Sequence, residues 1–272
     1  MSKEEKLAEI LTGYGRIALA FSGGIDSSFL LLKAKEILGR ENVLAVIIDS
    51  KLIRQSDTAH AISFAQKHNI WFEVLRIDEL KLENIRHYTV DSWYHSKILM
   101  YSSIITLAQK YQITKVVDGM IVDDLFDVRP GLKARDKLGV FSPLQIAGFS
   151  KVDVRNAAKK ITGISWNQPP SCSVMSRFPY GSLITSEKIR QVMKSETFLA
   201  KIGLEQVRVR HHGSLARIEV CKEQMVLAFE KRDEIVEALK SYGFIYISLD
   251  LLGYETGRMN EELQAKNSKE EL

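Results

Sequence analysis

The first part of the chain alternates short apolar runs with longer amphipathic segments, and this alternation limits the possible folds more than any other feature. The apolar runs cover Arg16–Phe21, Asn42–Ile48, Trp71–Ile77 and Lys115–Asp118. The segments between them place apolar residues at helical spacing. Parallel strands require long crossover connections, which are usually helices. The alternation therefore predicts an α/β fold in which helices cover both faces of a parallel sheet.

The predicted helices cover Ser27–Leu38, Ser56–His68 and a longer stretch over Ser92–Tyr111. The run at Asn42–Ile48 is continuous and rich in β-branched residues, which is typical of a strand buried on both faces. Ligands of such sheets bind at the carboxyl ends of the strands. Functional residues are therefore expected directly after the strands.

The sequence changes character after Ile164. Asn167–Tyr180 contains three of the five prolines and has no clean periodicity, which is typical of a long functional loop or linker. The rest predicts a helix over Ser186–Ile202, two strands within Gln206–Val220, a helix over Lys222–Tyr242 and a strand over Phe244–Leu251. We therefore expect a first domain over 1–165, a connecting loop over 166–182 and a smaller α+β domain over 183–272.

The composition is that of an ordinary soluble protein. The 272 residues are 45% apolar and 26% charged, with a net charge of +4. No apolar run approaches the roughly 20 residues of a membrane-spanning helix, and the charged first residues are unlike a signal peptide. The two cysteines, Cys172 and Cys221, form no Cys-x-x-Cys pair, so no zinc or redox motif is indicated. We expect a cytoplasmic protein that binds neither membranes nor nucleic acid.

A glycine-rich turn follows the first predicted strand and opens the first helix. Its residues are Ser22, Gly23, Gly24, Ile25, Asp26, Ser27 and Ser28. The glycines allow the backbone to approach a ligand closely. The serines can satisfy free amides at the start of the helix, whose positive dipole end faces an anion. The turn predicts a phosphate cradle, and the alternative is a simple strand-to-helix turn capped by Asp and Ser.

Acidic residues follow the fourth predicted strand. Asp118 and Gly119 end that strand, and Asp123, Asp124 and Asp127 come shortly afterwards. Carboxylates at the carboxyl edge of a parallel sheet are suitable ligands for Mg²⁺ or for a substrate. A solvated acidic turn is the alternative interpretation.

Cys172 lies in a polar stretch of the connecting loop, close to Ser176 and Arg177. A lone cysteine is usually a buried structural residue, but a nearby guanidinium favours the reactive thiolate. The local sequence leaves both interpretations open. Cys221 follows an apolar strand and is expected to be structural.

The segment Val207–Arg210 alternates with period two, so Arg208 and Arg210 are expected on one face of a strand. Two guanidinium groups on one face suit a phosphate or a carboxylate. The alternative is a solvent-facing strand edge protected by charge. On the next strand, Arg217 and Glu219 have the same spacing and can pair with each other.

The glycine-rich turn lacks the lysine of the G-x-x-x-x-G-K-[ST] pattern. It resembles the S-G-G-x-D-S signature of the PP-loop ATP pyrophosphatases, which include amidating synthetases and tRNA-thiolating enzymes. The resemblance implies an adenine nucleotide alpha hydrolase-like fold and cleavage of ATP between its α- and β-phosphates, with Mg²⁺ bound alongside. It places Gly119 and Asp124 with the turn as nucleotide-binding residues, and Asp26 and Asp124 as metal ligands.

Further motifs extend the resemblance over almost the whole chain. They are D-S-W-Y at Asp91, D-G-M-I at Asp118, D-x-R-P-G-L-K-A-R at Asp127, S-C-S-x-x-S-R-F-P-Y-G at Ser171, R-V-R at Arg208 and G-R-M-N at Gly257. Together with the turn, they closely resemble the LarE-type sacrificial sulfur transferases of nickel-pincer nucleotide cofactor biosynthesis. The cysteine block and the R-V-R strand make this match specific.

The resemblance implies a reaction. ATP adenylates a carboxylate of pyridinium-3,5-biscarboxylic acid mononucleotide, and the Cys172 thiolate attacks the acyl-AMP to form a thioester. Elimination then breaks the Cβ–S bond, leaving a thiocarboxylate on the small-molecule substrate and dehydroalanine on the protein. Arg208 and Arg210 would hold the substrate phosphate, and Trp93 would pack on its flat ring. The implied catalytic residues are Cys172, Asp26, Ser176 and Arg177.

Some relatives use three cysteines to hold an iron–sulfur cluster, and a chain with two cysteines indicates the single-use route instead. Glu196 and Glu219 are candidates for family carboxylates in the smaller domain, with Glu196 a candidate metal ligand, whereas Leu227 stands where another acid is expected. The resemblance also implies a homo-oligomer, with a hexamer as one form. The alternatives are a tRNA-thiolating enzyme, which would need a broad basic surface, an amidating synthetase, and a nucleotide-binding sensor without catalysis.

Overall fold

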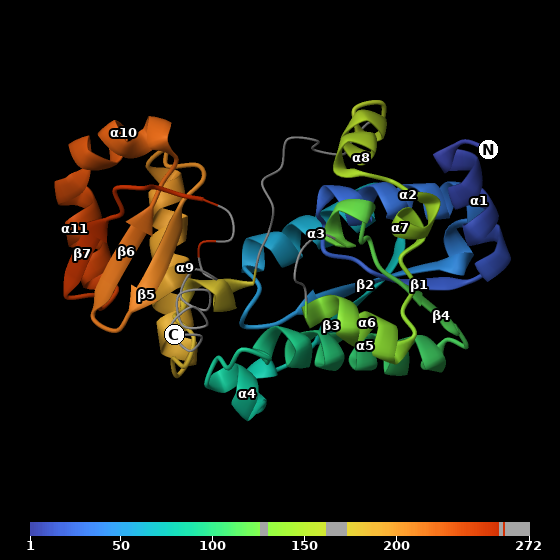
Figure 1. Ribbon diagram of the computed structural model, residues 1–272, viewed down its shortest axis with the longest axis horizontal. Helices are drawn as coiled ribbons and strands as arrows, with labels where there is room; N and C mark the ends of the chain where they lie inside the picture. The colour runs from blue at the N-terminus through green and yellow to red at the C-terminus, as the bar shows by residue number, and fades with distance from the viewer. Residues whose placement is uncertain (126–129, 162–172, 256–257, 259–272) are drawn as a thin grey trace, which may run out of the picture. The chain divides into compact units, whose positions relative to one another are not determined.

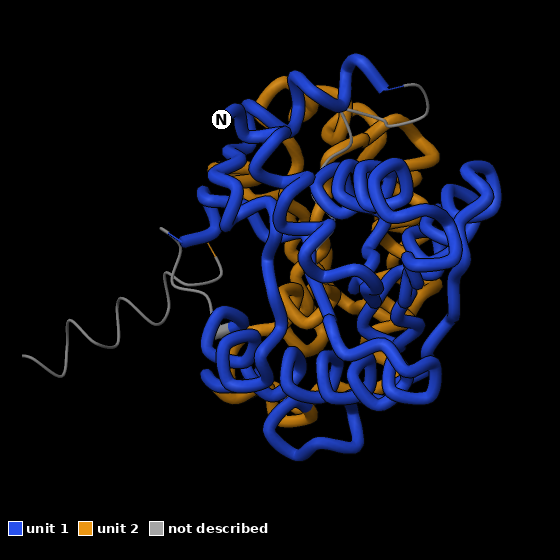
Figure 2. The backbone as a smooth tube through the Cα atoms, turned by 90° about the vertical axis from the view of Figure 1, so that its right-hand side faces the viewer, with its two compact units in different colours: residues 1–85, 90–171 blue, residues 86–89, 172–272 orange. Residues whose placement is uncertain are grey.

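The computed structural model describes residues 1–125, 130–161, 173–255 and 258. The chain divides into two compact units. Residues 1–85 and 90–171 form the first unit, and residues 86–89 and 172–272 form the second (Figure 2). The second unit therefore takes four residues from within the first part of the chain, an excursion that the predicted domain boundaries do not include.

The first unit is built on a four-stranded parallel sheet. Its strands are β1 (Ile17–Ala20), β2 (Val43–Asp49), β3 (Trp71–Arg76) and β4 (Lys115–Val117), in the order β3-β2-β1-β4 (Figure 1). Every residue of β2 before Asp49 is buried, as expected for a strand covered on both faces. The predicted parallel sheet is confirmed.

Helices cover both faces of this sheet (Figure 1). One face carries α1 (Lys3–Tyr14), α2 (Ile25–Leu38), α3 (Gln55–Lys67), α7 (Pro143–Ala147) and α8 (Lys151–Ala158), and the other carries α5 (Ser92–Lys110) and α6 (Pro130–Leu138). Alternate residues of a strand point to opposite faces. In β1, Ile17 and Leu19 join the apolar cluster that includes α2, whereas Ala18 joins the cluster that includes α5. The sheet thus has an apolar core on each side.

The strand order favours a ligand site beside β1. The chain moves from β1 to β2 and β3 on one side, and later returns to place β4 on the other side of β1. In doubly wound sheets, such a reversal opens a crevice at the carboxyl ends of the two strands where the order changes. The glycine-rich turn follows β1, and the acidic residues follow β4.

The second unit is a smaller α+β structure, as predicted. Its sheet has the order β5-β6-β7, with β5 and β6 antiparallel and β6 and β7 parallel. The strands are β5 (Arg208–His212), β6 (Leu215–Glu219) and β7 (Tyr246–Leu249), and the helices are α9 (Ser186–Lys201), α10 (Met225–Glu230) and α11 (Arg232–Ser241). One apolar cluster joins the sheet to these helices.

The prediction of one helix over Lys222–Tyr242 is wrong in its continuity. A 3-10 turn comes first, α10 ends at Glu230 and α11 starts at Arg232. Lys231 separates the two helices because its φ of −91° and ψ of 14° lie outside the helical range. Apolar periodicity continues across a break of one residue, so the sequence pattern did not indicate it.

The longest helix of the described ranges is the 19-residue α5, and neither it nor any other helix there is apolar enough to cross a bilayer. A short helix, α4 (Glu83–Arg86), precedes α5 and leads into the residues that join the second unit.

Candidate functional site

The glycine-rich turn opens α2, and the Gly24 amide within it donates to the Ser22 hydroxyl at 3.3 Å. Gly24 is the N-cap, and no side chain caps the helix. The Ser27 hydroxyl instead donates to the Gly24 carbonyl at 3.0 Å and lies 3.1 Å from the Ser22 hydroxyl. The expectation that Ser27 caps the helix amides is therefore wrong. The uncapped start of a 14-residue helix suits an anion, because amides and the helix dipole both point toward it.

Two glycines are required by close backbone approaches around this turn. Gly23 has a φ of +75°, and a Cβ on it would lie 3.2 Å from the Cβ of Ala61 in α3. A Cβ on Gly119 would lie 2.9 Å from both the Cα and the N of Ser27. The loop after β4 thus rests directly on the first turn of α2. The structure brings together the two segments that the sequence placed after separate strands.

Asp118 holds the loop after β4 rather than facing a ligand. Its carboxylate accepts hydrogen bonds from the Tyr101 hydroxyl at 2.7 Å, the Ser142 hydroxyl at 2.6 Å and the Met120 amide at 3.1 Å. The residue is buried. Burial and the neighbouring carboxylate together raise the pKa of Tyr101 well above its usual value. Asp118 is thus a structural anchor for Gly119.

Asp26 has one paired and one unpaired oxygen. Its Oδ2 lies 2.6 Å from the Nζ of Lys151, in the first turn of α8. Its Oδ1 is buried and has no hydrogen-bond partner among the described residues. Burial raises the pKa of Asp26 despite the opposing effect of Lys151. A buried carboxylate oxygen without a donor is suited to a cation that arrives with a ligand.

Lys151 was not identified from the sequence. Its amide donates to the Asp123 carboxylate at 2.9 Å, so the acidic segment after β4 fixes the start of α8. The adjoining Ser150-x-x-Asp153 capping box marks the helix start. That local signal does not indicate that Lys151 contacts Asp26, because the two residues are far apart in the chain and meet only in the folded protein.

Asp124 is close enough to Asp26 for its charge to raise the pKa of that carboxyl. One of its oxygens accepts the Ile121 amide at 2.9 Å. Magnesium in nucleotide sites is commonly bound through one or two carboxylates together with substrate phosphates. Asp26 and Asp124 therefore fit this donor set. Asp127, also predicted, lies outside the described residues.

Trp93 lies half-buried in the first turn of α5. The start of that helix is fixed by the Ser92 hydroxyl, which donates to the Asn84 carbonyl at 2.6 Å, and by His95, which lies 2.8 Å from Asp91. Stacking of Trp93 on a substrate ring stays a prediction.

In the second unit, Arg177 forms a buried ion pair with Glu196. The Nε and Nη2 atoms of Arg177 lie 2.8 and 3.2 Å from the two carboxylate oxygens, and the Val209 amide also donates to Glu196. Arg177 donates through Nη1 to the Ser176 hydroxyl at 2.7 Å. Both oxygens of Glu196 are thus engaged, so its role as a metal ligand stays a prediction without support from this geometry. Within the described ranges, no group of three or more metal-binding side chains occurs.

Arg208 and Arg210 are both buried on β5, at the spacing that places them on one face. Glu219 on β6 accepts hydrogen bonds from both Nε and Nη2 of Arg210, at 2.9 and 2.6 Å. It also accepts one from Arg217 at 2.9 Å. The predicted pairing of Arg217 with Glu219 is confirmed. The guanidinium of Arg208 lies over the ring of Tyr254, 5.1 Å from its centre.

Arg258, which belongs to the G-R-M-N motif at Gly257, and Asp250, which the sequence did not single out, complete an arginine cluster with Arg208, Arg210 and Arg217. Arg258 donates to Asp250 at 3.1 Å and lies 4.0 Å from Glu219, and Asp250 also lies 3.4 Å from Arg217. Arg210 is held further by the Ser176 carbonyl, at 2.7 Å. Two carboxylates, Glu219 and Asp250, thus set the directions of three guanidinium groups of the cluster, those of Arg210, Arg217 and Arg258. Cys172 itself lies outside the described residues.

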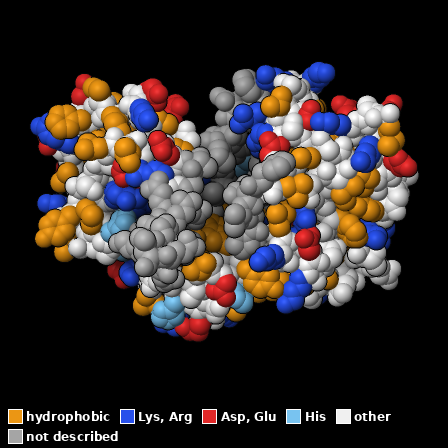
Figure 3. All heavy atoms as spheres, in the orientation of Figure 1, with side chains coloured by type: hydrophobic (Ala, Val, Ile, Leu, Met, Phe, Trp, Pro, Cys, Tyr) orange, Lys and Arg blue, Asp and Glu red, His pale blue; other side chains and the backbone are white. Residues whose placement is uncertain are grey.

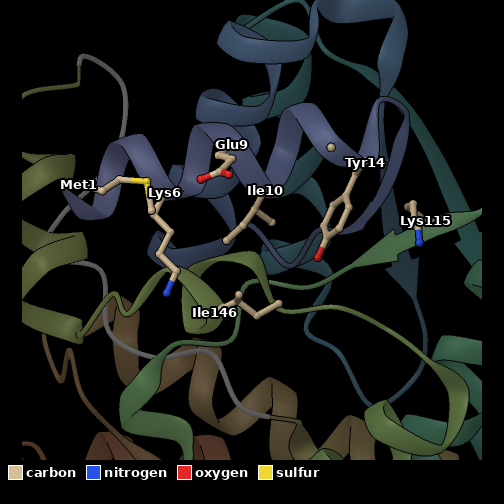
Figure 4. Close-up of a pocket in the computed structure, with 8 residues that line it drawn as sticks. Met1, Lys6, Glu9, Ile10, Tyr14, Lys115 and Ile146 are labelled. Atoms are coloured by element: carbon tan, nitrogen blue, oxygen red, sulfur yellow. The ribbon is translucent and has the colours of Figure 1, made fainter.

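A shallow hollow of about 480 Å³ lies elsewhere on the first unit, beside α1 (Figure 4). Its lining includes Lys6, Glu9 and Tyr14 of α1, together with Lys115 and Ile146 from other elements. The Lys115 ammonium makes a cation–π contact with the Phe141 ring, whose centre is 4.7 Å away. The predicted site residues that the structure describes all lie outside this hollow. On the face drawn in Figure 3, acidic and basic side chains are interspersed.

Comparison with known proteins agrees with this arrangement. The sequence profile of the NAD synthase family matches residues 5–96, which include the glycine-rich turn. The pyridinium-3,5-bisthiocarboxylic acid mononucleotide synthase of Lactiplantibacillus plantarum is 41% identical over 262 residues, which are 96% of this chain and 95% of that protein. An uncharacterized protein of Synechocystis is 33% identical over 96% of this chain and 98% of its own length.

A more distant relative matches in part. The glutamine-dependent NAD(+) synthetase of Aquifex aeolicus is 40% identical over 68 residues, covering 25% of this chain and 12% of that protein. The near full-length match to the Lactiplantibacillus plantarum synthase, together with the NAD synthase profile, confirms the resemblance drawn from the motifs and the expectation of an enzyme. The chain belongs to the family of pyridinium-3,5-bisthiocarboxylic acid mononucleotide synthases.

Proposed function

We propose that this protein is an ATP-dependent sulfur transferase that converts a carboxylate of pyridinium-3,5-biscarboxylic acid mononucleotide into a thiocarboxylate, using the sulfur of its own Cys172. The observation that carries the proposal is the pairing of Asp26 with Lys151 at the uncapped start of α2. The near full-length similarity to the Lactiplantibacillus plantarum synthase supports the choice of substrate.

The first half-reaction is adenylation at the carboxyl edge of the parallel sheet. The amides at the start of α2 would hold the phosphates of ATP, with Gly23, Gly24 and Gly119 allowing their close approach. The Lys151 ammonium lies 2.6 Å from Asp26 and would bind a phosphate oxygen of ATP in place of that carboxylate. Mg²⁺, held by Asp26 and Asp124, would neutralise charge on the triphosphate. The substrate carboxylate attacks the α-phosphorus, and pyrophosphate leaves.

The second half-reaction transfers the sulfur. The Cys172 thiolate attacks the acyl carbon and AMP leaves, which forms a thioester between substrate and protein. A base removes the Cα proton of Cys172, and the electron pair expels the sulfur from Cβ. The products are a substrate thiocarboxylate and dehydroalanine at position 172. Each protein molecule therefore donates one sulfur atom.

The arginine cluster of the second unit would bind the substrate phosphate. Arg208 and Arg210 share one face of β5, and the Glu219 carboxylate and the Ser176 carbonyl fix the direction of the Arg210 guanidinium. Oriented guanidinium groups bind phosphate oxygens in pairs. Trp93 would cover the flat ring of the substrate. Ser176 and Arg177, which are bonded to each other, would shape the segment after Cys172.

An intact-mass measurement tests the proposal. After incubation with ATP, Mg²⁺ and the biscarboxylate mononucleotide, the protein mass is expected to fall by one H₂S for each thiocarboxylate formed. Cys172→Ala should still release pyrophosphate but form no thiocarboxylate, whereas Cys221→Ala should do both. Formation of thiocarboxylate by protein of unchanged mass would sink the proposal.

The same assay separates the alternatives. A nucleotide-binding sensor would release no pyrophosphate with the mononucleotide, and a tRNA-thiolating enzyme would require tRNA for that release. RNA binding favours a broad basic surface, whereas the net charge of this chain is only +4. We further propose that the protein acts in the cytoplasm as a homo-oligomer, with the hexamer as the form to test by light scattering. The domains over 1–165 and 183–272, joined by 166–182, remain part of this proposal.

A further inference from the structure

Residues 86–89 form a strap that the first part of the chain contributes to the second unit. Two backbone hydrogen bonds fasten it there. The Ile184 amide donates to the Arg86 carbonyl at 2.7 Å, and the Gly181 amide donates to the Tyr88 carbonyl at 2.9 Å. The strap is therefore bonded to residues 181–184, the segment that directly follows the Ser-Arg-Phe-Pro-Tyr sequence at 176–180.

Tyr88 is the central residue of this strap. Its side chain is completely buried, and its ring is stacked on Tyr180 with centres 4.5 Å apart and planes 10° from parallel. Aromatic rings at this separation and angle attract each other beyond the effect of burial alone. The contact joins the strap to the segment that carries Ser176 and Arg177.

The backbone of Tyr88 is strained. Its φ of +40° lies in the left-handed region that residues with side chains rarely adopt. Asn69 and Gln112 also have positive φ, but both are exposed and follow the ends of helices. A bulky buried residue keeps such a conformation only when its surroundings enforce it, and such residues concentrate at functional sites.

A short and stiff connection leads from Tyr180 to the arginine cluster. Only Phe178 and Pro179 separate Tyr180 from Arg177, and Pro179 fixes its own φ. Just before these residues, the Ser176 carbonyl accepts a hydrogen bond from Arg210, and Arg177 forms an ion pair with Glu196. A displacement of Tyr180 would therefore reach the carbonyl that orients Arg210.

From these contacts we infer that Tyr88 is a positioning residue for sulfur transfer: its ring holds Tyr180, and through it the Ser176 carbonyl and the Arg177 guanidinium. The inference rests on the proposed function. At saturating substrate, which offsets a weaker hold of Arg210 on the substrate phosphate, it predicts that loss of the ring slows the sulfur-transfer half-reaction and leaves adenylation intact. The reason is that Tyr88 packs within the second unit, whereas the turn at the start of α2 and Lys151 belong to the first.

The variants are Tyr88→Leu, which removes the ring, and Tyr88→Phe, which keeps it. Tyr111→Leu is the control, because Tyr111 forms an aromatic pair with Trp71 inside the first unit, at 5.0 Å. At saturating ATP and substrate, Tyr88→Leu should lower the single-turnover rate of H₂S loss by about tenfold or more. Pyrophosphate release should stay within about twofold of the unmodified protein. Tyr88→Phe and Tyr111→Leu should leave the rate of H₂S loss unchanged.

Hydrogen exchange gives a second readout that needs no turnover. Amides of residues 173–184 should exchange faster in Tyr88→Leu than in Tyr88→Phe or Tyr111→Leu, since only the first loses the stack. Unchanged exchange there would overturn the inference, and so would equal losses of pyrophosphate release and sulfur transfer in Tyr88→Leu. If the unmodified protein loses no H₂S, the proposed function fails instead, and the exchange measurement alone decides whether Tyr88 holds the segment.

Discussion

The Nζ of Lys151 lies 2.6 Å from the Oδ2 of Asp26, although 125 positions separate the two residues in the chain. Each residue stands in the first turn of a helix, Lys151 in α8 and Asp26 in α2. The pair therefore brings a cation and a carboxylate to the anion-attracting end of α2. The other oxygen of Asp26 is buried without a hydrogen-bond partner among the described residues, which leaves it available to an additional ligand.

Removal of Lys151 should reduce adenylation more than stability. Lys151→Ala is expected to lower the rate of pyrophosphate release by about 100-fold, because a fixed charge beside a transferring phosphoryl group contributes most in the transition state. The exposed Lys160 provides the control, and Lys160→Ala should release pyrophosphate at the normal rate. A rapid-quench assay of pyrophosphate at saturating ATP checks both. Equal rates for the two variants would remove Lys151 from the nucleotide site.

Gly119 should tolerate no side chain. In Gly119→Ala the new Cβ would lie 2.9 Å from two backbone atoms of Ser27, so either the loop or the start of α2 must move. We expect a loss of about 1–3 kcal/mol in the free energy of unfolding, together with weaker ATP binding. Gly13→Ala is the matched control, because a Cβ there meets nothing within 4 Å and Gly13 lies within α1. The free energy of unfolding of that variant should rise by about 0.5–1 kcal/mol, because alanine is more stable in a helix than glycine. Denaturant titration and ATP titration measure these effects.

His211 should make the second unit sensitive to acid. Burial between Phe178 and Phe244 lowers the pKa of His211 from 6.5 to about 4, with the Lys188 charge acting in the same direction. Protonation is thus easier in the unfolded chain, so the stabilising contribution is complete above pH 6.5 and is lost as the pH falls toward 4. Each pH unit by which the pH falls in this window lowers the free energy of unfolding by up to about 1.4 kcal/mol.

The matching variant is His211→Gln, which cannot be protonated. Between pH 7 and pH 5, the free energy of unfolding of the unmodified protein should fall by about 1–2 kcal/mol more than that of the variant. Thermal unfolding by circular dichroism at both pH values measures the difference. Parallel pH profiles would assign the acid sensitivity to other groups.

Glu219 should contribute strongly to the stability of the second unit. Its side chain is fully buried and pairs with Arg210 and Arg217, so Glu219→Gln would leave buried guanidinium charge without its carboxylate. Removing one partner of such a buried ion pair lowers the free energy of unfolding by about 3–5 kcal/mol. Glu223→Gln, at an exposed position of the same unit, should change stability by less than about 0.5 kcal/mol. Similar midpoints in a urea titration would contradict the structural role of Glu219.

Patterns that are local in the chain were predictable from the sequence. The strands, the crossover helices and the glycine-rich turn follow from periodicity and spacing over about ten residues. The placement of Arg208 and Arg210 on one face follows from the strand period of two. These features need no knowledge of which elements meet.

Features that depend on tertiary contacts were not predictable in this way. Asp118 was recognised only as the end of the fourth strand, and nothing local in the sequence indicates that Tyr101 and Ser142 donate to its carboxylate. Lys151 carries no local signal for its contact with Asp26. The pairing of Arg177 with Glu196 could not be read from spacing either, because the two residues come from separate elements of the second unit. In each case the deciding partner lies on an element whose position only the fold determines.

The strap at residues 86–89 makes the second unit a discontinuous domain. A protein truncated to residues 172–272 would lack Tyr88, and the ring of Tyr180 would lose its stacking partner. During synthesis, the strap leaves the ribosome long before the segment it grips, so this unit can be completed only after nearly the whole chain has emerged. Gene fusion or domain exchange at a single junction near residue 172 would therefore transplant an incomplete unit, whereas a graft that carries both pieces would preserve it.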